Sequence, residues 1–211
     1  KPEIYIFDDS FSALDYKTDS ILRKELKKYT KDATSLIVAQ RIGTIMHADK
    51  IVVLDKGKIQ QVDTPRNIYN IPANTFVATF MGTNPMNLID AHVNHGFLTF
   101  ANISIELEAL PEEIKNYSSL IVGIRSEDIK TSFDPAYHFN DIKFTSTITF
   151  EENLGSYKNI YFKLAETNFC AIANAQSPSI NLVDFSINSK NLHFFDAITK
   201  MPIVKKIEFD I

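Results

Sequence analysis

The chain has 211 residues, 45% of them hydrophobic and 23% charged, which is the balance of an ordinary globular protein with one or two domains. Its net charge is −4 and its pI about 5.7, so charge gives no argument for a nucleic-acid partner. The single cysteine, Cys170, excludes an internal disulfide framework and lies in an apolar run that predicts a buried structural thiol, and no apolar stretch is long enough to span a membrane.

The first predicted element is a short apolar strand that ends in two acids. Ile4–Phe7 form a continuous apolar run, which is typical of a strand buried on both faces in a parallel sheet. Asp8 and Asp9 follow at the carboxyl end of this strand, where open α/β sheets bind their ligands. The pattern therefore predicts a ligand site here, and the alternative is a strand that ends in two solvated carboxylates.

Helices and strands alternate in the segment that follows. A helix is predicted over 16–29, with Asp15 as its N-cap and lysines at its solvated C-terminal end. Further elements are expected as a strand at 34–39, a short helix at 42–48, a strand at 50–54, a turn at 55–58 and a returning strand at 59–62. Strands that alternate with helices favour a parallel α/β sheet.

A change of pattern after residue 82 predicts a second domain. Thr64 and Pro65 suit the N-cap and first position of one short helix, and a second helix is expected over 72–82. Short candidate strands separated by turns follow at 98–107, 120–125, 144–150, 160–164, 169–173 and 191–195. Because this spacing predicts a small β-barrel or sandwich, the domains are expected to be residues 1–82 and 83–211.

Residues 3–15 read Glu-Ile-Tyr-Ile-Phe-Asp-Asp-Ser-Phe-Ser-Ala-Leu-Asp, and this string resembles the Walker B motif and D-loop of an ATP-binding cassette (ABC) ATPase. The resemblance implies ATP and Mg²⁺ as cofactors. The resemblance also implies that Asp8 binds Mg²⁺ through water and that Asp9 orients or deprotonates the attacking water. It further implies that Asp15 lies at the nucleotide-binding interface of an ATPase homodimer, and that Gln40, after the second strand, contacts the γ-phosphate.

Two of these positions depart from the family pattern. Asp9 replaces the family's catalytic glutamate and is one methylene shorter, although a general base must come within about 2.6–3.2 Å of the proton or act through a water. Gln40 replaces the usual histidine and can donate a hydrogen bond, but it carries no positive charge. Two interpretations stay open: hydrolysis is slower than in a glutamate–histidine site, or an adjusted backbone compensates.

Further strings carry a second resemblance, at Thr64–Gly82, Met86–Leu88, Val122–Ile129, Leu154–Ser156 and Asn191–Asp196. They are similar to the ATP-binding subunits of maltose-type sugar importers, which end in an OB-like regulatory domain. Arg125, Glu127 and Asp128 form a ligand patch or, as the resemblance implies, order this domain and its dimer contact. Ser126 and Lys200 stand where the family usually has Pro and Gly, which puts only local turn geometry in question.

The fold expected from both resemblances is a partial ABC ATPase core with a parallel α/β sheet, followed by an all-β OB-like barrel. The sequence contains no Gly-x-x-x-x-Gly-Lys-Ser/Thr phosphate loop and no Leu-Ser-Gly-Gly-Gln-like segment. We therefore expect the chain to be the C-terminal part of a longer protein and to be inactive as an ATPase by itself. The alternative is a catalytically dead regulatory or solute-binding module.

The implied reaction is Mg-ATP hydrolysis coupled to solute uptake, with a sugar as the favoured solute and polyamine, sulfate, phosphonate or iron as alternatives. The implied partners are membrane permease subunits and a second ATPase subunit, at the cytoplasmic face of the plasma membrane. The five histidines show no metal-ligand spacing. Apolar residues at 4–7 and 36–38 predict exposed strand surfaces and association of the chain, which light scattering would measure.

Overall fold

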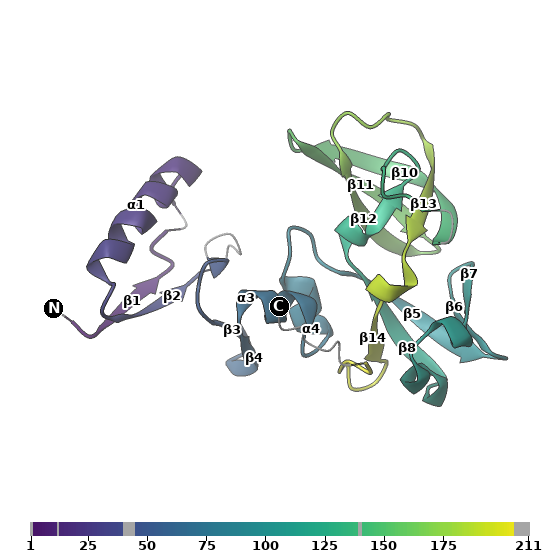
Figure 1. Ribbon diagram of the computed structural model, residues 1–211, viewed down its shortest axis with the longest axis horizontal. Coiled ribbons are helices and arrows are strands. Elements are labelled where there is room, and N and C mark those ends of the chain that lie inside the picture. The colour runs from purple at the N-terminus through teal and green to yellow at the C-terminus, as the bar shows by residue number, and fades with distance from the viewer. Residues whose placement is uncertain (1, 12, 40–44, 139–140, 205–211) are drawn as a thin grey trace.

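The computed structural model describes residues 2–11, 13–39, 45–138 and 141–204, with a small helix-containing part followed by a larger β part (Figure 1). In the first part, β1 (Ile4–Asp8) and β2 (Thr34–Val38) form a two-stranded parallel sheet. They are connected by α1 (Tyr16–Tyr29), the long crossover that parallel strands require. The two strands and the helix predicted for this segment are confirmed.

The side chains of this small sheet are largely exposed. Ile4 and Ile6 on β1 are 61% and 68% exposed, and Leu36 and Val38 on β2 are also exposed. The prediction that the first strand is buried on both faces is therefore wrong for the described residues, because two strands and one helix cannot cover both faces of a sheet. The exposed apolar strand surfaces expected from the same residues are confirmed.

The next two strands form an antiparallel hairpin, with β3 at Ile51–Asp55 and β4 at Lys58–Asp63. Lys56 and Gly57 in its turn have φ of +47° and +76°, the left-handed pair that a tight two-residue hairpin turn requires. Both strands and the turn are confirmed. Among the described residues, parallel pairing within 1–82 is limited to β1 and β2. Residues 42–44 of the helix expected at 42–48 lie outside them; of its four described residues, Ile45 is helical and Met46 and His47 form a turn.

Two short helices follow the hairpin. α3 (Pro65–Asn70) begins as predicted, with the Thr64 side chain as its N-cap. α4 (Thr75–Phe80) begins later than the residue 72 we predicted, because the Asn74 side chain caps it by accepting a hydrogen bond from the Val77 N–H at 2.9 Å. The small core of this part includes Ile51, Val53, Ile68, Val77 and Met81. No helix in the described ranges is long and apolar enough to cross a membrane.

The β part contains two five-stranded antiparallel sheets, with strand orders β14-β8-β5-β6-β7 and β12-β11-β10-β13-β9. The strands of the first sheet are β5 (Asn87–Asn94), β6 (Phe97–Phe100), β7 (Ile103–Glu106), β8 (Ser119–Ile124) and β14 (His193–Asp196). Those of the second are β9 (Ile129–Thr131), β10 (Ile142–Asn153), β11 (Tyr157–Leu164), β12 (Thr167–Asn174) and β13 (Leu182–Ile187). Short 3₁₀ helices lie between strands: η1 (Leu107–Ala109), η2 (Glu112–Asn116), η3 (Ser126–Asp128) and η4 (Ser189–Asn191).

The predicted all-β character of this part is confirmed, although individual strands differ. The single strand expected over 98–107 is two strands, β6 and β7, because Ala101 adopts a φ of +50° and the chain turns back. β5, β9 and β13 were not predicted. In β5 the buried face begins with Asn87 and continues through the small Ala91, which obscures the apolar alternation that identifies a strand.

One apolar core is shared by the two sheets. The ring of Phe185 lies 4.3 Å from that of Phe162 and 5.3 Å from that of Phe144, measured between ring centres. Leu120 of the other sheet belongs to the same buried cluster. Cys170 is buried as a free thiol, as its apolar run predicted.

Candidate functional site

Asp8 and Asp9 lie at the carboxyl end of β1, beside the end of β2. Asp8 pairs in register with Val38, and the Asp9 backbone N–H donates a hydrogen bond to the Val38 carbonyl at 3.1 Å. Both acids are exposed. The β1–α1–β2 unit thus places two carboxylates in solvent at the carboxyl edge of a parallel strand pair, which is where α/β sheets place ligands.

The backbone of Asp9 is in the left-handed region, with a φ of +46°. The other non-glycine residues described with positive φ lie in turns, namely Lys56, His95, Ala101, Ala165 and Lys200. Asp9 also follows a strand directly, as most of these residues do, but the chain then leads into α1 rather than back into an antiparallel strand. This conformation costs a non-glycine residue about 1–2 kcal/mol, although Asp tolerates it better than most. Such strain clusters at functional sites, so it supports a role in which the direction of the Asp9 carboxylate matters.

Aromatic and cationic groups hold the loop that leads from these acids to α1. Phe11 is buried, and its ring centre lies 5.5 Å from that of Phe7 on β1. The guanidinium of Arg23 on α1 lies 4.4 Å from the centre of the Phe11 ring, and Arg23 also forms an ion pair with Asp19 at 2.7 Å. These contacts fix the start of the loop against the helix.

Asp15 is the N-cap of α1, as predicted. Its carboxylate accepts hydrogen bonds from the Thr18 backbone N–H at 3.0 Å and from the Thr18 hydroxyl at 2.7 Å. The hydroxyl bond and then the backbone bond lower the pKa of Asp15 below its ordinary value. Its contact with a second ATPase subunit stays a prediction. Gln40, two positions after Val38, lies outside the described residues.

The two acids after β1 suit a magnesium ion that is shared with phosphate groups. Mg²⁺ prefers oxygen ligands and usually takes only one or two carboxylates from the protein, the remaining ligands being water and phosphate oxygens. Asp8 and Asp9 offer such carboxylates, adjacent in the chain and exposed. Among the described residues, no group of three or more His, Cys, Asp or Glu side chains is arranged to hold a metal by itself.

A buried arginine joins the β part to the ends of α3 and α4. Arg125, which follows β8, is 2% exposed and donates hydrogen bonds to the backbone carbonyls of Tyr69, Ala78 and Met81 at 2.6, 3.0 and 2.5 Å. Its guanidinium also lies 4.1 Å from the centre of the Tyr69 ring. Burial lowers the pKa of Arg125 to about 10, so the side chain remains a cation at neutral pH. A cation interacts favourably with the backbone carbonyls at the C-terminal ends of α3 and α4.

Gly82 is required by this junction. Its φ is +130°, and a Cβ atom there would lie 2.8 Å from the Asn84 carbonyl oxygen and 3.3 Å from Nη1 of Arg125. The interpretation that Arg125 orders the domain is supported, since its guanidinium already donates hydrogen bonds to backbone carbonyls of the α3 and α4 segments. Sequence reasoning missed its partners, because they are backbone carbonyls, which every residue type provides.

Comparison with known proteins gives no matching protein-family model. The trehalose/maltose import ATP-binding protein MalK of Thermococcus litoralis is 30% identical, over 94% of this chain and 57% of that protein. The multiple sugar-binding transport ATP-binding protein MsmK of Streptococcus mutans is 31% identical over 95% of this chain and 59% of its own length. The sn-glycerol-3-phosphate import ATP-binding protein UgpC of Psychromonas ingrahamii is 33% identical over 100% of this chain and 57% of its own length.

The chain therefore spans less than two thirds of the length of the curated relatives it matches. Among solved structures, the cytoplasmic molybdate-binding protein ModG aligns with 51% of this chain, at a TM-score of 0.37 and 9% identity. This similarity is too low to carry information about function.

Proposed function

We propose that this chain, which is homologous over nearly its whole length to the ATP-binding subunits of ABC sugar importers, carries part of the ATPase site and the regulatory domain of such a subunit. The reaction is Mg-ATP hydrolysis coupled to uptake of a solute, and a sugar is the solute that the names of the relatives favour. The observation that carries the proposal is the β1–α1–β2 unit, with Asp8 and Asp9 exposed at its carboxyl edge.

Each acid has a separate role in the proposed site. Asp8 holds Mg²⁺ through water, and the ion neutralises charge on the phosphates. Asp9 orients the attacking water or accepts its proton, a contribution of about 10²- to 10⁴-fold for a positioned base. Gln40 contacts the γ-phosphate, and Asp15 lies at the interface between two nucleotide-binding subunits. The exposure of Asp8 and the backbone conformation of Asp9 support these assignments.

The proposed domains are the C-terminal portion of the nucleotide-binding domain, residues 1–82, and an OB-like regulatory domain, residues 83–211. The change of architecture supports this boundary, since α4 ends at Phe80 and the first strand of the large sheets begins at Asn87. The proposed partners are permease subunits in the membrane and a second ATPase subunit, so the protein acts at the cytoplasmic face of the plasma membrane.

The test is ATP hydrolysis by the product of the complete reading frame, assembled with its permease. Asp9→Asn removes the base but keeps the size of the side chain, and we expect turnover to fall at least about 100-fold. Asp8→Asn should raise the Mg²⁺ concentration needed for half-maximal activity. Ser10→Ala, at the next position of the same loop, is the matched control and should be active. Unchanged turnover in Asp9→Asn would contradict the proposal.

A second candidate function is a regulatory or solute-binding module that does not hydrolyse ATP. Such a module needs no glycine-rich phosphate loop, a motif that the 211 residues do not contain. Calorimetry of the product of the complete reading frame, with Mg-ATP and, separately, with maltose, discriminates between the two functions. Maltose binding without Mg-ATP binding to the complete product would favour the module, whereas Mg-ATP binding there would favour the ATPase subunit.

A further inference from the structure

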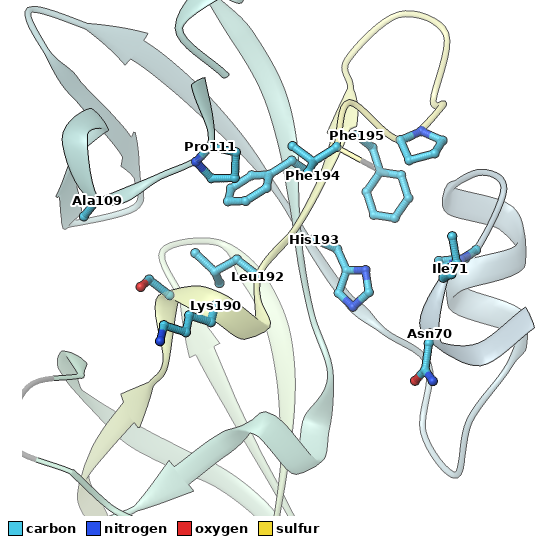
Figure 2. A pocket seen from close by; sticks show the side chains of 13 residues that line it. Asn70, Ile71, Ala109, Pro111, Lys190, Leu192, His193, Phe194 and Phe195 are labelled. Atoms are coloured by element: carbon cyan, nitrogen blue, oxygen red, sulfur yellow. The ribbon is translucent and has the colours of Figure 1, made fainter. Parts of the chain in front are cut away.

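A cavity of about 350 Å³ lies beside the junction between the two parts of the molecule. Its walls come from the end of α3 and the two residues after it (Asn70–Pro72), the segment from the end of η1 to Pro111, the segment from η4 through β14, and Pro202 and Val204. Figure 2 shows the His193 ring between β14 and the Asn70–Ile71 segment. Cavities of this volume, at an interface between structural units, are typical small-molecule sites.

The lining combines an apolar surface with a few polar groups. The apolar side chains include Ile71, Pro72, Pro111, Leu192, Pro202 and Val204. The polar side chains are Asn70, Ser189, Lys190 and His193, so the titratable groups of the described lining are a lysine and a histidine, without a carboxylate. None of the ion pairs found among the described residues involves Lys190. Glu112, the first residue of η2 and the neighbour of Pro111, is already paired with Lys115 at 2.6 Å.

Both walls of the cavity are held by hydrogen bonds. The Gln61 side chain donates to the Ile71 carbonyl at 3.0 Å and accepts from the Ala73 N–H at 2.8 Å, which fixes the segment after α3. On the other side β14 is paired with β8, with His193 opposite Gly123. The cavity is therefore formed before a ligand arrives, which reduces the entropy lost on binding.

We propose that this cavity binds a small organic anion, with a ring or other apolar body against the prolines and Leu192 and with a carboxylate or phosphate group near Lys190 and His193. The charge of the lining favours an anion over a cation, and its apolar surface favours an organic anion over an inorganic one. The proposal goes beyond the ATPase function, because the cavity contains neither Asp8 nor Asp9. A ligand there contacts both parts of the molecule at their junction.

The test uses benzoate, phenyl phosphate and the neutral isostere benzamide as probes, titrated into the chain without nucleotide and observed by NMR. We expect benzoate or phenyl phosphate to shift the signals of the His193 ring and of the Ile71, Leu192 and Val204 methyl groups. Benzamide should bind more weakly. Lys190→Gln should weaken binding of the anions about threefold to fivefold without affecting benzamide, and Lys24→Gln on α1 is the control for charge alone.

Ala109→Trp provides an independent variant, because Ala109 is an exposed residue of the lining and a large side chain there occupies the cavity. It should abolish the methyl shifts for all three probes. The proposal is overturned if no probe shifts these signals at about 20 mM, a concentration well above the millimolar Kd of a weak ligand. It is also overturned if benzamide binds as tightly as benzoate, which would indicate a site for neutral solutes. Since no nucleotide is present, failure of the ATPase proposal leaves this result unaffected.

Discussion

The two parts of the molecule contain similar apolar strands but use them differently. Phe185 in the β part is completely buried, whereas Ile6 on β1 is 68% exposed. Both residues belong to regular strands with standard pairing. The difference is the number of layers, since two five-stranded sheets share a core, whereas the two-stranded sheet has one helix, which cannot cover both of its faces.

An apolar strand sequence therefore predicts a strand but not its burial. Burial of a large apolar side chain contributes about 1.5–3 kcal/mol, so the stability of the described structure is concentrated in the β part. The smaller part has its own core around Ile68 and Val77, and it is joined to the β part through Arg125. Variants in the two parts should therefore differ strongly in their effect.

The largest expected effect is that of Phe185→Ala. It removes a ring that stacks on Phe144 and Phe162, and we expect the free energy of unfolding to fall by about 3–5 kcal/mol. Ile6→Ala, a comparable truncation on the exposed sheet, should change it by less than about 0.5 kcal/mol. Urea unfolding followed by circular dichroism measures both, and similar losses in the two variants would refute the contrast.

A second variant, Arg125→Met, tests the connection between the two parts. It leaves the carbonyls of Tyr69, Ala78 and Met81 without their donor, and we expect a loss of about 3 kcal/mol, since each buried unpaired group costs about 1–3 kcal/mol. Arg66→Met, at an exposed position on α3, is the matched control. Limited proteolysis should show faster cleavage between residues 80 and 87 in the first variant only; equal cleavage rates would argue against a junction held by Arg125.

Lys200→Gly should have a smaller and stabilising effect. Lys200 has a φ of +62°, a conformation that glycine adopts without the cost of about 1–2 kcal/mol that other residues bear. We expect a gain of about 1 kcal/mol by urea unfolding, with no gain for Lys200→Ala, which keeps a Cβ atom. An equal gain from alanine would show that loss of the lysine side chain, rather than backbone conformation, is responsible.

The smallest effect is expected at the exposed cap of α1. Because hydrogen bonds from Thr18 lower the pKa of Asp15, the stability that this contact gives is present above the ordinary value of 3.8 and is lost as pH falls through the lower value of the folded state. The Thr18 amide signal, followed by NMR from neutral to acidic pH, should report this loss. Asp15→Asn should remove the pH dependence and keep the cap; a Thr18 signal that titrates in both forms would contradict the assignment.

Much of the candidate site could be predicted from sequence because its geometry is local. The apolar run before Asp8 indicated β1, and Asp15 indicated the start of α1. The left-handed backbone of Asp9 could not be predicted, since Asp, unlike Gly, gives no strong signal for it. The strands β5 and β9 were missed because a polar inner residue and a length of three residues hide the two-residue period. In β13, by contrast, Val183, Phe185 and Ile187 alternate with polar residues, so the sequence did contain the signal for this strand.

Local sequence was enough to predict the helix caps at Asp15 and Thr64, the Lys56–Gly57 turn, the β1–α1–β2 unit and the relationship to sugar-importer ATP-binding subunits. Only the tertiary structure decided which strand faces are buried, which carbonyls Arg125 binds, why Gly82 is required, and where the cavity lies. The physical reason is distance along the chain. A cap or a turn involves residues a few positions apart, whereas Arg125 meets carbonyls that lie 44, 47 and 56 positions away.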